Sequence, residues 1–282
     1  MDDPSLHVLF LHPSARLAAQ RVVRDLGAHL HVHELDARPG ESSFDRMATR
    51  LAELWGSASG LVVLAPTGVV VRSIAPLLRH KLTDPAVVCC DVHGRWAVSL
   101  VSGHEGGANR LAAQVATCLQ AEPIITTTSE AARVHVAGIG CRHGVPLEIL
   151  REALSLALEQ AGLKPDDLRL LATSEAKRKE PGMVALADEL DLPLRLLSHR
   201  EIRTLRPHVR RSAASRHFPV PAVSEPAALL SGTRTRCILK KFIHRGVTVS
   251  IARELCAWSE SDPATRSTAP AAPKPPSPHP PS

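Results

Sequence analysis

A repeated order of short apolar strand, glycine-containing turn and helix restricts what this chain can fold into. Strands that alternate with helices in this way pair mainly in parallel, and helices cover both faces of the sheet. We therefore predict an α/β fold built of three-layer α/β domains with mainly parallel or mixed sheets. The pattern recurs at residues 61–78, 96–116 and 134–161.

The remaining elements follow from apolar periodicity and from turn residues. Predicted strands lie at 6–11, 30–35, 61–65, 87–89, 96–101, 124–128, 134–139, 168–172, 194–197, 237–239 and 247–252. Predicted helices lie at 14–26, 44–55, 69–78, 146–161, 183–190 and 223–230, the last of them capped by Ser224.

The length of 282 residues is enough for two domains with separate cores. We place one domain at residues 1–130 and the other at 134–258. Residues 259–282 consist mainly of Pro, Ser, Ala and Thr and cannot bury enough apolar surface to order themselves, so we predict a disordered tail.

Charge is divided unevenly along the chain. Residues 1–130 hold 11 Lys and Arg against 13 Asp and Glu, whereas residues 131–282 hold 23 against 15. The second half therefore suits an acidic partner. Nucleic acid is a poor candidate, because an aromatic content of 2% without tyrosine leaves few rings for base stacking. No helix-turn-helix or RNP signature supports it either.

Cysteine spacing and the start of the chain bear on location. None of the six cysteines forms a CxxC pair, which argues against a zinc ribbon or a dithiol redox site. Nothing at the start resembles a signal peptide, and no apolar run approaches about 20 residues. We expect a cytoplasmic protein with free thiols and no membrane segment.

The segment SGHEGGAN, from Ser102 to Asn109, has the composition of a functional turn. Its glycines let the backbone approach a ligand, and the helix that follows offers amide groups to an anion. Ligands of parallel sheets gather at the carboxyl ends of strands, where we expect both this loop and the Thr67-Gly68 turn. The alternative is a tight turn capped by Asn109, with His104 merely solvated.

A series of motifs in fixed order resembles a known family. TGVVVRSIAPLL (67–78), KLTDPAVV (81–88), SGHEGGAN (102–109) and IITTT (124–128) resemble the N-terminal domain of the CbiG family, the cobalt-precorrin-5A hydrolases of vitamin B12 biosynthesis. GIGCRHG (138–144), the segment 177–182, SEPAALL (224–230), Lys240 and VTVSIAR (247–253) resemble its C-terminal domain.

The resemblance covers about residues 58–253 and has two departures. Family members typically carry a middle domain, but only Ser129–Arg133 separates the matching parts here. Glu105 stands where the family usually has leucine.

The resemblance implies a defined reaction. The enzyme opens a δ-lactone on a cobalt-bound corrin precursor and releases a two-carbon unit as acetaldehyde, which gives cobalt-precorrin-5B. Cobalt arrives with the substrate, so no cofactor and no protein metal site are implied. The implied partners are this polycarboxylate corrinoid and other enzymes of the same pathway.

His104 is our candidate general acid and base, because histidine titrates near neutral pH. It could instead only shape the loop or bind a carboxylate arm. Ser102, Gly103, Gly106, Gly107 and Asn109 are candidate donors to an oxyanion or carboxylate.

Other residues are candidates for binding the substrate's acidic arms. Thr67, Gly68 and Arg72 could form a second carboxylate cradle, unless Arg72 is simply an exposed helix arginine. Gly140, Arg142, Lys177 and Glu180 could bind the periphery of the macrocycle, although Lys177 and Glu180 could equally be a surface ion pair.

Two further alternatives remain open at this point. Cys141 is more simply a small buried residue than a nucleophile, because no base is evident beside it in the sequence. The whole protein could also be a corrinoid-binding or carrier protein of the same pathway that has lost turnover.

Overall fold

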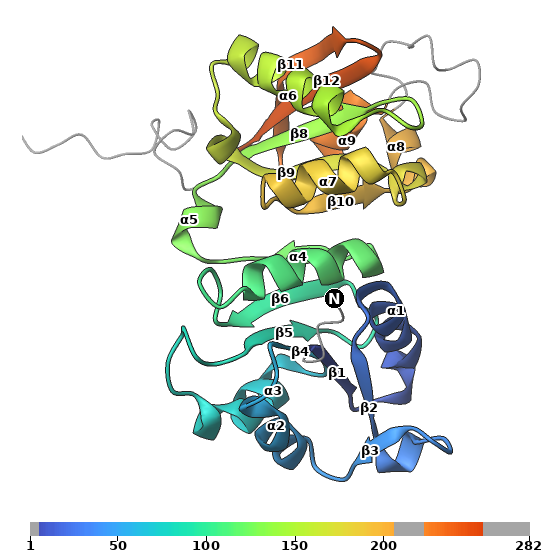
Figure 1. The fold of residues 1–282 in the computed structure, drawn as a ribbon, viewed down its shortest axis with the longest axis vertical. Helices are drawn as coiled ribbons and strands as arrows, with labels where there is room; N and C mark the ends of the chain where they lie inside the picture. The colour runs from blue at the N-terminus through green and yellow to red at the C-terminus, as the bar shows by residue number, and fades with distance from the viewer. Residues whose placement is uncertain (1–5, 206–222, 256–282) are drawn as a thin grey trace, which may run out of the picture.

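The computed structural model describes residues 6–205 and 223–255, which form two β-sheets with helices on both faces of each (Figure 1). The predicted α/β architecture with two three-layer domains is confirmed. The domain limits drawn at residues 130 and 134 fall between the last strand of the first sheet and the first strand of the second. The tail predicted to be disordered lies outside the described residues.

The first sheet has seven strands. They are β1 (Leu6–Phe10), β2 (His29–His33), β3 (Ser42–Phe44), β4 (Gly60–Leu64), β5 (Ala86–Cys90), β6 (Trp96–Val101) and β7 (Glu122–Ile124). Their spatial order is β3-β2-β1-β4-β5-β6-β7, and neighbours are parallel except for the antiparallel pair β5 and β6.

Two helices cover each face of this sheet. Helices α1 (Arg16–Leu26) and α4 (Ala108–Leu119) pack on the face to which Val8 and Phe10 point. Helices α2 (Met47–Trp55) and α3 (Thr67–Ile74) pack on the other face, against Leu9. This alternation along β1 follows from the two-residue period of a strand, and it explains why the buried strands read as continuous apolar runs.

The second sheet has five strands, β8 (His135–Gly140), β9 (Leu168–Ser174), β10 (Leu194–Leu197), β11 (Thr235–His244) and β12 (Val247–Glu254). Their order is β10-β9-β8-β12-β11; the first three are parallel, and β12 is antiparallel to both of its neighbours. One face is covered by α6 (Leu147–Ala161) and α7 (Pro181–Glu189), the other by α8 (His199–Thr204) and α9 (Ser224–Leu230).

The direction of β6 determines at which end of the sheet the SGHEGGAN loop lies. Only residues 91–95 connect β5 to β6, which is too short for a crossover, so the two strands form an antiparallel hairpin. Because β4 runs parallel to β5 and β6 runs antiparallel to it, the carboxyl end of β6 lies beside the amino ends of β4 and β5. SGHEGGAN and Thr67-Gly68 thus both follow the carboxyl ends of strands, as expected, but they do not lie together, because these strands run in opposite directions.

Four local expectations also differ from the structure. Ser42–Phe44 forms the edge strand β3, so the helix predicted from Phe44 begins only at Met47. Thr128 begins the short helix α5 (Thr128–Ala131) instead of ending a strand. Ser224 is the first helical residue and not a cap, and its hydroxyl lies 3.0 Å from that of Ser250. Helix α8 was not predicted.

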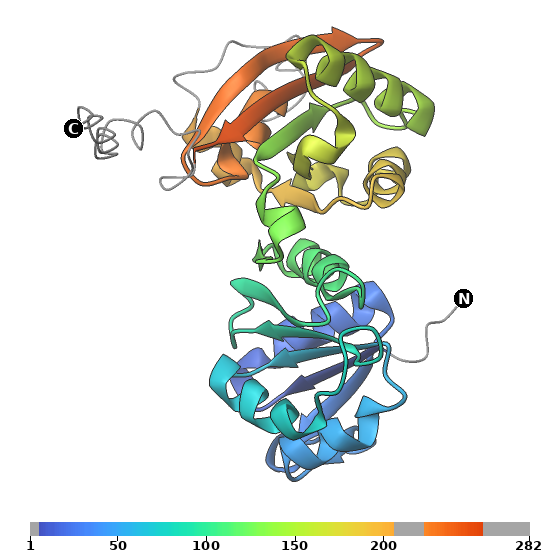
Figure 2. The same ribbon diagram turned by 90° about the vertical axis from the view of Figure 1, so that its left-hand side faces the viewer.

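The two halves meet mainly where α4 lies beside β10 (Figures 1 and 2). The Thr117 hydroxyl on α4 is 2.7 Å from the carbonyl oxygen of Leu194, and Arg178 donates to the carbonyl oxygen of Thr117 at 3.3 Å. Arg195 on β10 forms an ion pair with Glu122 on β7. Hydrogen bonds and an ion pair thus connect the two halves. In the described ranges, no helix combines the length and hydropathy needed to cross a membrane.

Candidate active site

The central loop, residues 102–107, folds back on itself between β6 and α4. Ser102 has a left-handed backbone with φ 61°, and its hydroxyl donates to the carbonyl oxygen of Asp84 at 3.0 Å. The amides of Ala108 and Asn109 donate to the carbonyl oxygens of Ser102 and Gly103 at 3.0 and 2.9 Å. These hydrogen-bond donors are occupied inside the loop, so in this arrangement they are not free to bind an anion.

The glycines close this loop. A Cβ on Gly106 would lie 2.3 Å from the Cβ of Ser102, and one on Gly103 would lie 2.8 Å from Cγ2 of Thr127. Gly107 precedes α4 with φ 84°, a left-handed conformation that glycine adopts without strain. Close packing and backbone conformation account for all three glycines without a ligand.

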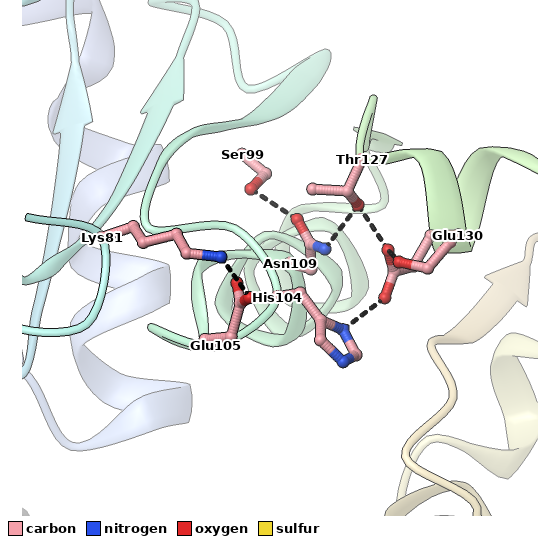
Figure 3. A network of polar contacts seen from close by, with 8 residues as sticks. Lys81, Ser99, His104, Glu105, Asn109, Thr127 and Glu130 are labelled. Atoms are coloured by element: carbon pink, nitrogen blue, oxygen red, sulfur yellow. Dashed lines mark hydrogen bonds and ion pairs between the residues drawn. The ribbon is translucent and has the colours of Figure 1, made fainter.

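A chain of hydrogen bonds connects the loop to the start of α5 (Figure 3). Asn109 is buried, and its amide oxygen accepts from the Ser99 hydroxyl at 2.7 Å. Its amide nitrogen donates to Thr127 Oγ1 at 2.8 Å, and that hydroxyl donates in turn to Glu130. Asn109 is therefore a buried link and not the helix cap, a position that Gly107 holds.

The chain ends at an imidazole–carboxylate pair, His104 and Glu130, which we call the dyad. His104 Nδ1 lies 2.7 Å from Oε1 of Glu130, and their side chains are 57% and 16% exposed. Burial opposes ionisation of Glu130, but hydrogen bonds from Ser129, Thr127 and His104 outweigh it and lower its pKa to about 2. Glu130 is thus an anion at neutral pH that orients the imidazole and leaves Nε2 unengaged by this contact.

The dyad borders a cavity of about 810 Å³ between the two halves of the molecule. His104, Glu130 and the exposed face of α4 line one side, and the end of α7 with the start of β10 lines the other. This volume is within the range of roughly 300–1,000 Å³ found for small-molecule sites. Of the candidate residues from the sequence, His104 and Asn109 line the cavity.

The Thr67 cradle lies elsewhere. Thr67 begins α3 after the carboxyl end of β4, at the end of the sheet opposite to the central loop. Its hydroxyl is 3.6 Å from Cys89 Sγ. Arg72 turns back along its own helix and donates to the carbonyl oxygen of Gly68 at 3.3 Å. None of Thr67, Gly68 and Arg72 lines the cavity. The Thr67-Gly68 turn and the SGHEGGAN loop therefore do not border one cavity.

The candidates in the second half do come together, at the carboxyl ends of β8 and β9. Lys177 Nζ lies 3.0 Å from Glu180 Oε2 and donates to the carbonyl oxygen of Arg142 at 2.8 Å. Glu180 also accepts from the Gly144 amide at 2.7 Å and contacts His143 Nδ1 at 2.9 Å.

This ion pair is buried, with Lys177 7% and Glu180 2% exposed, so its interpretation as a surface pair is wrong. Burial opposes ionisation of Glu180, yet its hydrogen bonds from Lys177, Gly144 and His143 lower its pKa. The pair fixes the 141–144 turn, and its residues, with Gly140 and Arg142, do not line the cavity.

Cys141 and Glu105 have simple environments. Burial raises the pKa of the Cys141 thiol, which suits a small packed residue better than a nucleophile. Glu105 forms an exposed ion pair with Lys81 at 2.5 Å, beside the dyad (Figure 3). No group of three or more His, Cys, Asp or Glu side chains in the described ranges is arranged to hold a metal ion.

Sequence reasoning found His104 and missed its partners. Glu130 lies in the short segment between the two sets of motifs, and the run Thr127-Thr128-Ser129-Glu130 has the T-x-x-E form that starts helices. That signal predicts a helix start at Thr127. A carboxylate at this position lies near the strand that pairs with β7, which is β6. Pairing with His104, 26 positions earlier, required the parallel pairing of β6 with β7.

Two family models match the chain. The model described as "Cobalamin synthesis G N-terminal" matches residues 49–130, and the one described as "Cobalamin synthesis G C-terminus" matches residues 135–252. Only residues 131–134 lie between the two matches, in agreement with the short connection seen in the sequence.

Two curated relatives share one name. A protein of Priestia megaterium named cobalt-precorrin-5A hydrolase is 50% identical over 80 residues, which are 28% of this chain and 21% of that protein. The chain thus matches about a fifth of that relative's length. A protein of Salmonella typhimurium with the same name is 24% identical over 88% of this chain and 97% of that protein.

A solved structure is also similar to part of the chain. It is described as CobE, a protein from the cobalamin biosynthetic pathway, and is 32% identical over 43% of this chain and 91% of that one. The TM-score of the match is 0.41.

Proposed function

The chain belongs to the CbiG family of cobalamin synthesis proteins, and from this premise we propose that it hydrolyses the δ-lactone of cobalt-precorrin-5A and releases acetaldehyde to give cobalt-precorrin-5B. The observation that carries the proposal in the structure is the His104–Glu130 dyad at the border of the cavity. A hydrolase needs a general base that activates water beside the bound substrate, and His104 of the dyad is the group we propose for this role.

The dyad suits the first step, the attack of water on the lactone carbonyl. Glu130 accepts from Nδ1, so this nitrogen carries the proton and Nε2 presents a lone pair. Nε2 takes a proton from water as the oxygen attacks, and the resulting imidazolium is stabilised by the charged Glu130. Collapse of the tetrahedral intermediate breaks the ester C–O bond, and the imidazolium gives its proton to the departing oxygen. The products are the alcohol of the two-carbon bridge and a carboxylic acid that loses its proton to solvent, and His104 is neutral again.

The second step breaks a carbon–carbon bond. The freed alcohol loses its proton, its oxygen becomes the aldehyde oxygen, and the bond to the macrocycle breaks with its electrons remaining on the ring. The ring carbon or its conjugated system then takes up a proton. His104 is placed to remove the first proton and to return one, because a dyad can cycle between its two protonation states.

The cobalt ion is part of the substrate in this proposal, and the protein supplies no cofactor of its own. The acetate and propionate arms make the substrate a polyanion, which agrees with the positive charge of residues 131–282. We further propose that the protein acts in the cytoplasm alongside other enzymes of the corrin pathway.

Anaerobic incubation with cobalt-precorrin-5A and measurement of acetaldehyde tests the proposal. We expect acetaldehyde in amounts equal to the substrate consumed, and a fall in rate of about 100-fold or more for His104→Gln. His93→Gln, an exposed histidine in the β5–β6 connection, serves as the control with an unchanged rate.

The same assay distinguishes a hydrolase from a non-catalytic corrinoid carrier. A carrier binds the corrinoid and produces no acetaldehyde, even at protein concentrations that saturate the ligand. The names of the curated relatives favour the hydrolase. Undiminished turnover by His104→Gln would leave the reaction in place but remove His104 from it.

A further inference from the structure

We propose that Arg133 binds a carboxylate arm of the macrocycle in the cavity between the two halves, which His104 also borders. The inference rests on the proposed function for the identity of the ligand. Its physical basis is separate, namely a half-buried guanidinium that has no partner among the described residues and lies in the same cavity as the dyad.

Arg133 is placed by the same turn that places the catalytic carboxylate. Its amide donates to the carbonyl oxygen of Glu130 at 3.1 Å, directly after helix α5. Side chains three positions apart on a helical turn share one side of it. Arg133, Glu130 and His104 all line the cavity, so a cation and an acid–base pair border one space.

The guanidinium of Arg133 has no hydrogen bond or ion pair within residues 6–205 and 223–255. Partial burial removes some of its hydration, and nothing in that part of the protein replaces it. A ligand carboxylate would, because a guanidinium offers two parallel donors that match two carboxylate oxygens.

The other half-buried arginines of the cavity are already engaged. Arg169 pairs with Glu254 at 2.7 Å, and Arg178 donates to the carbonyl oxygen of Thr117. Arg110, which is more exposed, lies 3.8 and 3.7 Å from Asp188 and Asp191 across the cavity.

Most acidic side chains of the lining are engaged as well. Asp188 and Asp191 face Arg110, Glu189 pairs with Arg151, and Glu130 belongs to the dyad. The lining holds five Lys and Arg side chains against six carboxylates, so its net charge does not favour an anion. Arg133 differs from the other half-buried arginines in having no hydrogen bond or ion pair from its guanidinium in the described ranges. The inference therefore rests on one local contact, a ligand carboxylate against the Arg133 guanidinium.

Binding of uroporphyrin, a fluorescent ring with acetate and propionate arms, tests the inference without any turnover. We expect the wild-type protein to bind it and Arg133→Gln to weaken binding about tenfold or more. Arg133→Lys should recover only part of the affinity, because an ammonium cannot make the two parallel bonds. Arg200→Gln, an exposed arginine on α8, should bind like the wild type.

Steady-state kinetics of acetaldehyde release provide the second measurement. If the arm is held equally in the ground state and the transition state, Arg133→Gln raises KM about tenfold and leaves kcat within about twofold. Equal porphyrin affinity for wild type and Arg133→Gln, or no porphyrin binding by the wild type, overturns the inference. Arg133-dependent binding without acetaldehyde would sustain it while the hydrolase proposal fails.

Discussion

Thr127 shows how one hydroxyl can organise a site. It accepts from the buried Asn109 and donates to Glu130, so it connects the start of α4 to the dyad (Figure 3). Residues of this kind act through others: Thr127 does not line the cavity, yet it fixes the carboxylate that orients His104.

Replacing Thr127 by Val should therefore reduce kcat for acetaldehyde release roughly ten- to 100-fold, because a misplaced general base is costly. KM should change little, and the free energy of unfolding should fall by about 1 kcal/mol through the unpaired Asn109 amide. Thr128→Val, one residue along and exposed, is the matched control. Equal kcat values for the two variants would contradict the positioning role.

A second residue, His31, is predicted to make stability depend on pH. It is buried, with its ring nitrogens 3.0 Å from His7 Nδ1 and 3.0 Å from the Ser42 hydroxyl. Burial is the main cause that lowers its pKa to about 4, and Arg50, His7 and His29 add to the effect.

The folded protein thus keeps His31 neutral where the unfolded chain, with a pKa near 6.5, takes up a proton. The free energy of unfolding therefore has its full value above about pH 6.5. It decreases as the pH falls toward 4, by roughly 2 kcal/mol at pH 5. Urea unfolding at pH 7 and pH 5 measures this loss. His31→Gln should reduce it and the exposed His93→Gln should not; a loss unchanged in His31→Gln would exclude His31 as its source.

At the scale of elements, the sequence was sufficient for most helices and strands and insufficient for strand direction. Apolar runs and glycine turns located β4, β6, β8 and α6 within a few residues, since buried strands and amphipathic helices have distinct periods. An apolar run does not state its direction. The five-residue connection before β6 did carry that information, because parallel strands need a longer crossover.

The central loop is also an element whose closure can be tested. A Cβ on Gly106 would lie 2.8 Å from the carbonyl oxygen of Ser102 and 3.1 Å from that of Lys81, so the backbone must move to admit it. We expect Gly106→Ala to lower the free energy of unfolding by about 1–3 kcal/mol and to reduce acetaldehyde release. Gly56→Ala is the control, because a Cβ there meets nothing within 4 Å. Similar unfolding curves for both variants would show that the loop is open.

At the scale of the whole molecule, the cavity exists only because the two halves lie together. No sequence signal predicted this, since the contacts of Thr117 with Leu194 and of Arg195 with Glu122 join positions more than 70 residues apart. The sequence did supply His104. It also supplied the Lys177–Glu180 pair, which the parallel strands β8 and β9 place beside the 141–144 turn, but this pair lies outside the cavity.

Arg110 faces Asp188 and Asp191 across the cavity, so reversing its charge should push the halves apart. Like charges at about 4 Å repel by roughly 1–4 kcal/mol near a protein surface, and salt screens the repulsion. Arg110→Glu should enlarge the radius of gyration in small-angle X-ray scattering at low salt, and less so at high salt. Arg151→Glu, which breaks the Arg151–Glu189 pair within the second half, is the control. Identical scattering for both variants would argue against a cavity bounded by these residues.

The most direct test of the account is a double-mutant cycle on acetaldehyde release from cobalt-precorrin-5A, with His104→Gln, Glu130→Gln and the double variant. If the two side chains act as one acid–base unit, each single change removes most of the rate, and the double variant is no slower than His104→Gln. Rate losses that multiply in the double variant, or a Glu130→Gln variant as fast as the wild type, would contradict the assignment of catalysis to this pair.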